Sequence, residues 1–412
     1  MRDHSTQSDI DLAVVGGGVI GLALAWRAAQ RGLRVSVLER GEPGGATSWV
    51  AAGMLAPITE ADPGELALLR LGLASARAYP RFVAQLADGA DCDPGYLRCG
   101  TLVAARDGDE AQALGRELRM RQELGLAVAR LLPSEARRSE PALAPTLRAA
   151  LDVPDDHAID PRSLTSALAQ ALRGEGGELR SRTEVTGLAI SDQRVRGVEL
   201  AGGEQLSAER VVIAAGVWSG AVGGIPPHAR VPVHPVKGQI VRLRDPGGPG
   251  LLTRVLRMRD GYVVPRGDGR YVLGATMEER GFDTTVTAGA VLELLRDAVE
   301  LLPGLAELEL EECSAGLRPA TPDNAPLIGP GAIAGLYWAT GHHRNGVLLA
   351  PITAEIIAGM LVGDPPSEDV DAFSPARFAP APVAVAARRT SAIPEAKPAG
   401  AEPASVGAER WS

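Results

Sequence analysis

Apolar and polar residues are arranged along residues 10–39 in a way that predicts a strand, a helix and a second strand. Residues 10–15 are apolar except for Asp11, and a glycine-rich turn follows at 16–21. Small and apolar residues then recur with helical spacing, and a second apolar run at 35–38 ends beside Glu39. The pattern indicates a βαβ unit whose turn is made of glycine.

The same spacing rules predict further elements along the chain. Pro80 lies inside one expected helix and would kink or divide it. Asp160 is placed to cap another. Helices are expected over residues 65–86, 109–124, 161–172 and 287–302 and after the turn at 341–346, and strands over 97–105 and 336–339.

Two regions are rich in short strands. Residues 185–190, 195–200 and 204–206 predict an antiparallel meander, and 211–215 predict a parallel core strand. Residues 231–277 contain apolar runs joined by tight turns and predict a large antiparallel sheet. A meander inside an open α/β sheet is usual in flavoproteins with two dinucleotide folds. We therefore expect an α/β fold: a two-dinucleotide-fold FAD domain with a GxGxxG βαβ unit, and an antiparallel-sheet substrate domain flanked by helices.

The glycine turn carries a dinucleotide-binding pattern. Gly16 allows a tight turn, Gly18 lets the backbone approach a pyrophosphate, and Gly21 lets the helix pack closely on the strand. The helix directs backbone N–H groups and the positive end of its dipole at the phosphates. Glu39 is placed to accept hydrogen bonds from the ribose. The stretch leaves NAD and FAD both open, and a glycine-rich turn without a ligand is the plainer alternative.

Residues 41–57 are small and flexible, where a nicotinamide fold would continue with another helix. Small side chains suit the close passage of an extended cofactor, and the hydroxyls of Thr47 and Ser48 can meet a phosphate or the flavin edge. A glycine-rich surface loop is the alternative interpretation.

Composition narrows the function classes. The chain has 412 residues, enough for two or three domains of about 150 residues each. A net charge of −9 argues against a nucleic-acid partner, whose phosphates require a cationic surface. The three cysteines match neither a disulfide framework nor a zinc pattern, so buried thiols are expected and no metal site.

The two ends of the chain show no membrane signal. Residues 1–9 are polar, and the apolar stretch 347–362 is interrupted by Pro351 and Glu355 and falls short of a membrane span. We therefore expect a soluble, cytoplasmic protein without a membrane partner. Residues 379–412 consist mainly of Ala, Pro, Ser and Glu, which predicts a disordered tail.

Five local strings together resemble the glycine oxidases of the FAD-dependent D-amino-acid oxidase superfamily, which supply iminoacetate for the thiazole of thiamine. The strings are TSWVAAGMLAP, GYVVPR, LGATM, AGLRP and HHRNGVLLAP, and the likeness runs from about residue 9 to 378. The resemblance implies noncovalent FAD, O₂ as acceptor, and glycine, sarcosine and small D-amino acids as substrates. It also implies a homotetramer and hand-off of the imine product to a thiazole synthase.

By the same resemblance, four side chains form the substrate pocket. Arg318 matches the arginine that binds the substrate carboxylate, which suits its planar guanidinium. Tyr262 would line the same pocket, and Met277 would form part of its wall. Arg344 would lie near the substrate and the flavin. A structural ion pair for Arg318 and core positions for Tyr262 and Met277 are the alternatives. No catalytic base is required, and none is evident.

The helix after residue 346 would direct backbone N–H groups at the flavin N1–C2=O edge. The residues expected to contact FAD are Gly16, Gly18, Val19, Ile20, Gly21, Glu39, Arg40, Thr47, Ser48, Ala52, Gly53, Met54, Val185, Ala215, Gly216, Gly341, His342, Arg344, Asn345, Gly346, Val347 and Leu348. For His342, a loop histidine satisfied by the backbone is an equal alternative. The expected domains are a discontinuous FAD-binding domain of residues 9–80, 150–225 and 312–378, and a substrate-binding domain of 81–149 and 226–311.

Three departures from the related families limit this transfer. Asp260 stands where glycine oxidases can have a histidine. Gly316 stands where monomeric sarcosine oxidases attach FAD to a cysteine, and Cys313 lies three residues upstream. The RYVLG string lacks the lysine that activates oxygen in those enzymes.

Three other functions stay open at this point. A D-amino-acid dehydrogenase of the same superfamily would pass its electrons to a quinone or another carrier. A noncatalytic FAD-binding protein would hold flavin without reducing it. A nicotinamide dehydrogenase would show no absorbance near the flavin band.

Overall fold

The first sheet holds the βαβ unit. The computed structural model describes residues 10–378, so the tail predicted to be disordered lies outside the described residues. Strand β1 (Ile10–Val15) pairs in parallel with β2 (Val35–Leu38) on one side and with β12 (Gln205–Ile213) on the other. The remaining strands of this sheet are β9 (Glu178–Arg180), β10 (Val185–Ser191), β11 (Arg194–Leu200), β18 (Leu327–Pro330) and β19 (Leu336–Thr340).

Strand β12 belongs to both the meander and the parallel core of this sheet. Its first part pairs antiparallel with β11, and the part from Ala208 to Ile213 pairs in parallel with β1. The two strands expected at 204–206 and 211–215 are therefore one strand, because no turn residue interrupts the extended backbone between them. The predicted antiparallel meander of β10, β11 and β12 is confirmed.

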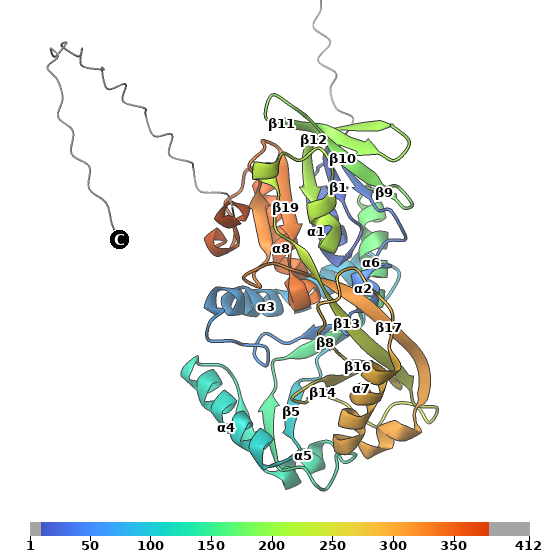
Figure 1. The fold of residues 1–412 in the computed structure, drawn as a ribbon, viewed down its shortest axis with the longest axis vertical. Helices are drawn as coiled ribbons and strands as arrows, with labels where there is room; N and C mark the ends of the chain where they lie inside the picture. Colours follow the sequence, from blue (N-terminus) through green and yellow to red (C-terminus); the bar gives the residue numbers. More distant parts are fainter. Residues whose placement is uncertain (1–9, 379–412) are drawn as a thin grey trace, which may run out of the picture. The chain divides into compact units, whose positions relative to one another are not determined.

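The second sheet is built on two long strands. β13 (His234–Arg244) pairs antiparallel with β17 (Glu309–Ala320) along nearly its whole length, and Figure 1 shows the two running side by side. This confirms the large antiparallel sheet, although β14 pairs in parallel with β5. The other strands are β16 (Arg270–Gly274), β15 (Tyr262–Pro265), β14 (Val255–Arg257), β5 (Thr101–Ala105), β7 (Ala149–Val153) and β6 (Ala129–Leu131).

A small third sheet joins β3 (Met54–Leu55), β8 (His157–Ile159) and β4 (Tyr96–Leu97). The prediction of a single strand over residues 97–105 was wrong, because β4 and β5 belong to different sheets. Gly100 lies between them with φ +68°, a left-handed conformation that ends the extended backbone.

The predicted helices are present, with small shifts at their ends. Asp160 caps α6 by accepting a hydrogen bond from the Arg162 N–H at 3.0 Å. Pro80 does not divide α3. The helices are α1 (Val19–Gln30), α2 (Thr47–Val50), α3 (Leu66–Asp88), α4 (Gly108–Glu123), α5 (Pro133–Ser139), α6 (Pro161–Gly174), α7 (Ala288–Leu301) and α8 (Gly346–Val362), besides short 3₁₀ turns such as Gly216–Ala221 and His343–Asn345.

Helix α8 is a core helix. The helical segment His343–Val362 is long and apolar enough to cross a membrane by length and composition, but 72% of its apolar window is buried inside the protein. Pro351 has no N–H for the carbonyl of Val347, and the buried Tyr79 hydroxyl donates to that carbonyl at 2.5 Å instead. Helix α3 thereby fixes the first turn of α8, which lies beside the cavity described below.

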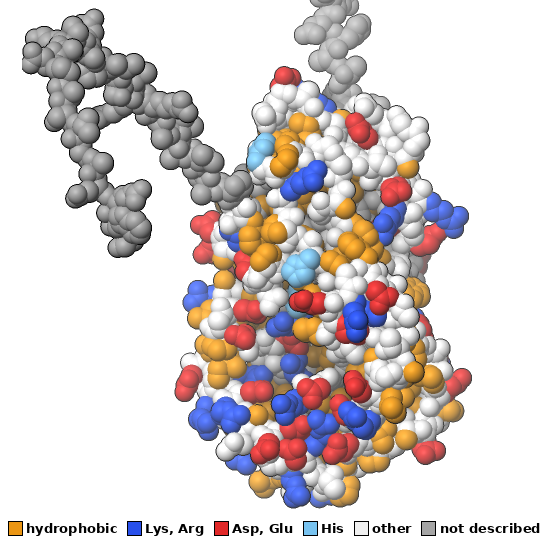
Figure 2. Space-filling model, viewed as in Figure 1, with side chains coloured by type: hydrophobic (Ala, Val, Ile, Leu, Met, Phe, Trp, Pro, Cys, Tyr) orange, Lys and Arg blue, Asp and Glu red, His pale blue; other side chains and the backbone are white. Residues whose placement is uncertain are grey.

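The surface shows no single-sign electrostatic face in the view of Figure 2. Acidic and basic side chains are interspersed over the part of the molecule that holds α4, α5 and α7, and the opposite part shows more apolar and uncharged surface. On this face the described residues form no large basic area, and the chain as a whole carries a net charge of −9.

Candidate active site

The glycine turn forms a close-packed cradle at the start of α1. Gly16 has φ +107°, and a Cβ on it would lie 2.6 Å from the carbonyl oxygen of Ala214. A Cβ on Gly21 would lie 2.0 Å from the carbonyl oxygen of Gly16, so α1 approaches the turn too closely for any side chain. The backbone can therefore meet a phosphate directly, as the sequence pattern requires.

Polar groups already line this cradle. The Val19 N–H, at the start of α1, donates to Ser48 Oγ at 3.0 Å. Glu39 accepts from the Gly17 N–H at 2.7 Å and from the Gly41 N–H at 2.9 Å, and its carboxylate keeps lone pairs for a ribose. A hydroxyl and a carboxylate at the amino end of a helix fit the adenosine and pyrophosphate half of a dinucleotide.

A cavity of 1280 Å³ extends from this cradle to Tyr262 and Arg318. It takes residues from both large sheets: Ala215 and Gly216 follow β12 of the first, and Tyr262 and Arg318 belong to the second. Its volume and its cradle fit an extended dinucleotide with further space toward Tyr262 and Arg318.

Nearly all the predicted contact residues line this one cavity. Gly21 and Gly341 do not; Gly21 lies behind the turn, and Gly341, at φ +74°, packs against Thr321. The predicted residues in the lining are Gly16, Gly18, Val19, Ile20, Glu39, Arg40, Thr47, Ser48, Ala52, Gly53, Met54, Val185, Ala215, Gly216, Tyr262, Met277, Arg318, His342, Arg344, Asn345, Gly346, Val347 and Leu348.

Arg318 is held by the backbone of the second sheet. Its Nη1 donates to the carbonyl oxygens of Lys237 at 3.2 Å and Thr276 at 3.0 Å. The guanidinium lies flat on Gly238, where a Cβ would come within 2.4 Å of Nη2. These contacts aim the free side of the guanidinium into the cavity, as an anion-binding group requires.

Tyr262 and Met277 lie beside Arg318. Burial raises the pKa of the Tyr262 hydroxyl above its ordinary value, although the Arg318 charge acts in the opposite direction, so the phenol stays neutral and can donate a hydrogen bond. Met277 lines the cavity with 64% of its surface exposed, so it is no core methionine.

Arg344 is tied into a cluster of charged residues that sequence reasoning did not find. Glu60 forms short ion pairs with both Arg344 and Arg257. Burial alone would raise the pKa of the Glu60 carboxyl, but the two guanidiniums outweigh it and hold that pKa below its ordinary value. Glu65 is a second acidic partner of Arg344, 3.8 Å from its Nη2. Glu60 and Arg257 lie outside the recognisable strings, so no local pattern marks them.

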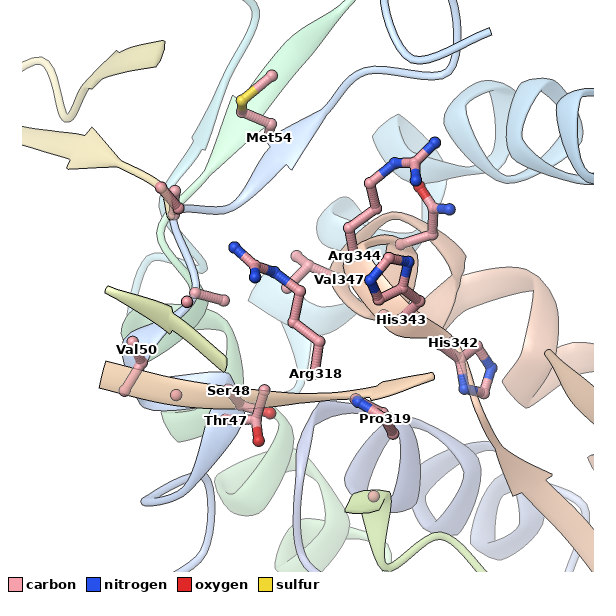
Figure 3. Close-up of a pocket in the computed structure, with 18 of the residues that line it drawn as sticks. Thr47, Ser48, Val50, Met54, Arg318, Pro319, His342, His343, Arg344 and Val347 are labelled. Atoms are coloured by element: carbon pink, nitrogen blue, oxygen red, sulfur yellow. The ribbon is translucent and has the colours of Figure 1, made fainter. Parts of the chain in front are cut away.

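The two histidines of the HHRNG string differ. His342 Nε2 is 3.0 Å from Thr353 Oγ1, and burial lowers the pKa of His342 to about 3. His343 is buried and neither ring nitrogen has a hydrogen-bond partner. Figure 3 shows the His343 ring near Arg344, and His342 directed away from them. Of the two, sequence reasoning had selected only His342.

The departures noted in the sequence have structural counterparts. Asp260 is exposed at the cavity lining, 3.7 Å from Arg106. Lys237, the one lysine among residues 10–378, is buried and donates to Asp283 at 2.7 Å, outside the cavity lining. A Cβ on Gly316 would lie 3.0 Å from Val50 Cβ, so a cysteine would be crowded there.

A dinucleotide cradle, a cavity shared by two sheets and a fixed arginine at its far end match an oxidoreductase that binds a dinucleotide cofactor. The family model described as "FAD dependent oxidoreductase" matches residues 11–360, and this chain belongs to that family. It is an enzyme whose cofactor is FAD.

Several relatives are similar along most of the chain. A glycine oxidase from Geobacillus kaustophilus is 35% identical over 370 residues, covering 88% of this chain and 96% of that protein. A solved structure of glycine oxidase from Geobacillus kaustophilus superposes with a TM-score of 0.83 at 34% identity, covering 89% of this chain and 98% of the other. The bifunctional protein ThiO/ThiG of Trichormus variabilis is 36% identical over 371 residues, covering 89% of this chain but 55% of its own length. The chain thus spans about half of that relative.

Proposed function

We propose that this enzyme oxidises glycine and other small amino acids, such as sarcosine and small D-amino acids, to their imines. The observation that carries the proposal is the fixed guanidinium of Arg318, which faces the cavity beside the neutral Tyr262 hydroxyl. A planar cation and a neutral donor together match a carboxylate. The similarity to glycine oxidases supports the same substrate class.

In this reaction the residues of the chain act mainly by positioning the substrate. Arg318 and Tyr262 hold the carboxylate, so that the substrate Cα–H points back into the cavity. FAD, when bound, supplies the redox chemistry by accepting a hydride. Backbone N–H groups at the start of α8 favour negative charge at that end of the cavity. The neutral amine becomes an imine as the hydride leaves Cα and a proton leaves nitrogen.

Oxygen is the proposed electron acceptor, with H₂O₂ and the imine as products; the imine would hydrolyse to the oxoacid and ammonia. The test is an anaerobic flavin-bleaching screen with glycine, sarcosine, D-alanine and D-proline, followed by H₂O₂ detection in air. Absence of bleaching by every compound would contradict amino-acid oxidation. Bleaching without H₂O₂, together with reduction of an artificial acceptor, would assign the enzyme to the dehydrogenases instead.

Arg318→Ala is the matched variant for this screen. It should keep FAD and lose roughly a hundredfold or more in kcat/KM, because it removes a charge-assisted contact made to the substrate. Arg138→Ala, at an exposed residue of α5 outside the cavity lining, is the control. An unchanged kcat/KM in Arg318→Ala would remove Arg318 from the site.

Noncovalent attachment of FAD belongs to the same proposal. The crowding at Gly316 supports it, and Cys313 lies on β17 outside the cavity lining. Acid precipitation should release all flavin into the supernatant, and flavin that stays with the pellet would contradict noncovalent binding.

The last part of the proposed function is transfer of the imine to a thiazole-forming synthase. It is supported by the bifunctional relative, whose name combines two activities in one chain. Thiazole formation from glycine in a mixture of this enzyme and a synthase should then exceed formation from equal amounts of glyoxylate and ammonia. Equal yields would contradict direct transfer.

A further inference from the structure

His343 is buried, with 7% of its surface exposed, and it lines the cavity. It lies in the 3₁₀ turn His343–Asn345 that precedes α8, with φ +46°. Neither Nδ1 nor Nε2 has a hydrogen-bond partner in the protein. A buried polar group that stays unpaired costs about 1–3 kcal/mol, so an imidazole with two unpaired nitrogens indicates a group that a ligand satisfies.

The charges around the imidazole indicate which ligand that is. Arg344 on the same turn and Arg318 on β17 act on His343 as positive groups, His234 on β13 does so when protonated, and Glu60 acts as a negative group. Glu60 is already shared between Arg344 and Arg257, and Glu65 lies 3.8 Å from Nη2 of Arg344. Two carboxylates thus face the three guanidiniums of Arg257, Arg318 and Arg344. The surroundings therefore carry an excess of positive charge, which favours an anion.

We propose that His343 is a substrate-binding residue, which donates a ring N–H to the substrate carboxylate that Arg318 and Tyr262 hold. The side chains of His343, Arg318 and Arg344 all line the cavity, and Figure 3 shows that they come from two elements, Arg318 from β17 and the other two from the turn before α8. A neutral imidazole offers one donor and one acceptor, so it completes the coordination of a carboxylate oxygen without adding a fixed charge.

The protonation of His343 supports this role. Burial and the two guanidiniums lower the pKa of His343 to about 4, so the free enzyme holds a neutral ring at neutral pH. A bound carboxylate offsets both guanidiniums and raises that pKa. Because the bound form then takes up a proton more readily than the free form, carboxylate affinity should increase as the pH falls through the raised pKa of the bound form toward 4.

The proposal rests on the amino-acid oxidation proposed above, and its test does not depend on turnover. The probe is fluoroacetate, a carboxylate without an amine that stays ionised over this pH range. It is titrated into the FAD-loaded enzyme, and binding is read from the change in flavin absorbance. His343→Phe keeps a ring and removes both nitrogens. We expect its dissociation constant for fluoroacetate to rise roughly ten- to a hundredfold, with bound flavin unchanged.

Two further variants test the donor itself. His343→Asn and His343→Gln place an amide N–H near Nδ1 and Nε2 respectively, and Asn also tolerates the left-handed backbone. One of the two should restore most of the affinity, but neither should restore its pH dependence. His228→Gln, an exposed histidine outside the cavity lining, is the control.

Several outcomes would overturn the assignment. If His343→Phe binds fluoroacetate with the affinity of the original enzyme, a contact between His343 and the carboxylate is excluded. A weakened Phe variant that neither amide restores would show a packing role. A changed flavin spectrum with unchanged fluoroacetate affinity would place the imidazole against the cofactor. If the Phe variant fails to fold, His343→Leu takes its place, since it also removes both nitrogens, and a fluoroacetate affinity equal to that of the original enzyme would refute the proposal. Because fluoroacetate binding is independent of oxidation, failure of the amino-acid screen is distinguishable from each of these results.

Discussion

Gly238 gives Arg318 its position. A side chain at this residue of β13 would meet the guanidinium within 2.4 Å of Nη2 and 2.5 Å of Nη1. The guanidinium is the far end of a flexible side chain, so it would move while the strand stays in place. We expect Gly238→Ala to fold and to bind FAD, but to raise the KM for glycine roughly tenfold or more, because a displaced guanidinium loses its paired contact with the carboxylate.

Steady-state kinetics and flavin content check this prediction. Gly108→Ala is the control, because a Cβ there has no atom within 4 Å. A KM for glycine that is the same in both variants would show that Arg318 does not need the space over Gly238.

Glu60 is predicted to stabilise the folded protein in a pH-dependent way. Glu60→Gln leaves Arg257 and Arg344 without their shared counter-ion, and should lower the free energy of unfolding at pH 7 by about 1–3 kcal/mol. Because the pKa of Glu60 is lowered in the folded state, its stabilisation is present above the ordinary glutamate pKa and is lost as the pH falls through the lowered value. Urea unfolding at pH 7 and pH 4 measures this. An equal difference between the two proteins at both pH values would contradict an ionic role.

At the scale of elements, α1 packs closely against the glycine turn in the cofactor half of the cavity. Gly21→Ala puts a methyl group 2.0 Å from the Gly16 carbonyl oxygen, so α1 must shift and its N-terminus must leave the pyrophosphate position. We expect the variant to bind FAD at least a hundredfold more weakly, measured by flavin fluorescence.

Gly115→Ala is the matched substitution in another helix. Gly115 lies within α4, and a Cβ on it meets no atom within 4 Å. The change should leave FAD affinity unaltered and stabilise the protein by about 0.5–1 kcal/mol. Unaltered FAD affinity in Gly21→Ala as well would show that the turn can relax around the methyl group.

Elements with a strong local signal could be predicted from the sequence, and elements that depend on distant partners could not. The βαβ unit and α6 with its Asp160 cap follow from spacing and capping alone. By contrast, β12 was expected as two strands, because its two halves serve different partners and only the sheet shows that one extended segment satisfies both. Strand β18 has no local signal and depends on its pairing with β19.

The same distinction holds for the site. Gly16, Gly18 and Arg318 belong to recognisable strings and could be named in advance, and all three line the cavity. Glu60 and Arg257 could not, because their ion pair joins residues 197 positions apart. His343 lies inside a recognised string, but its unpaired nitrogens are a property of the packed environment, which spacing does not reveal.

At the scale of the whole described molecule, FAD should link the two large sheets, because the cavity takes its lining from both. A ligand that binds only the folded state stabilises it by about 2.7 kcal/mol at a hundred times its dissociation constant. ADP can satisfy the cradle at Gly16, Gly18 and Glu39, whereas FAD also fills the space toward Tyr262.

At concentrations set to the same multiple of the FAD dissociation constant, thermal unfolding of flavin-free enzyme should therefore give the highest Tm with FAD, a smaller rise with ADP and the lowest Tm without ligand. Gly21→Ala should lose both increments, since both ligands need the start of α1, and Gly115→Ala should keep both. Equal stabilisation by ADP and FAD would mean that the cradle alone supplies the affinity and that the second sheet contributes no binding energy for the cofactor.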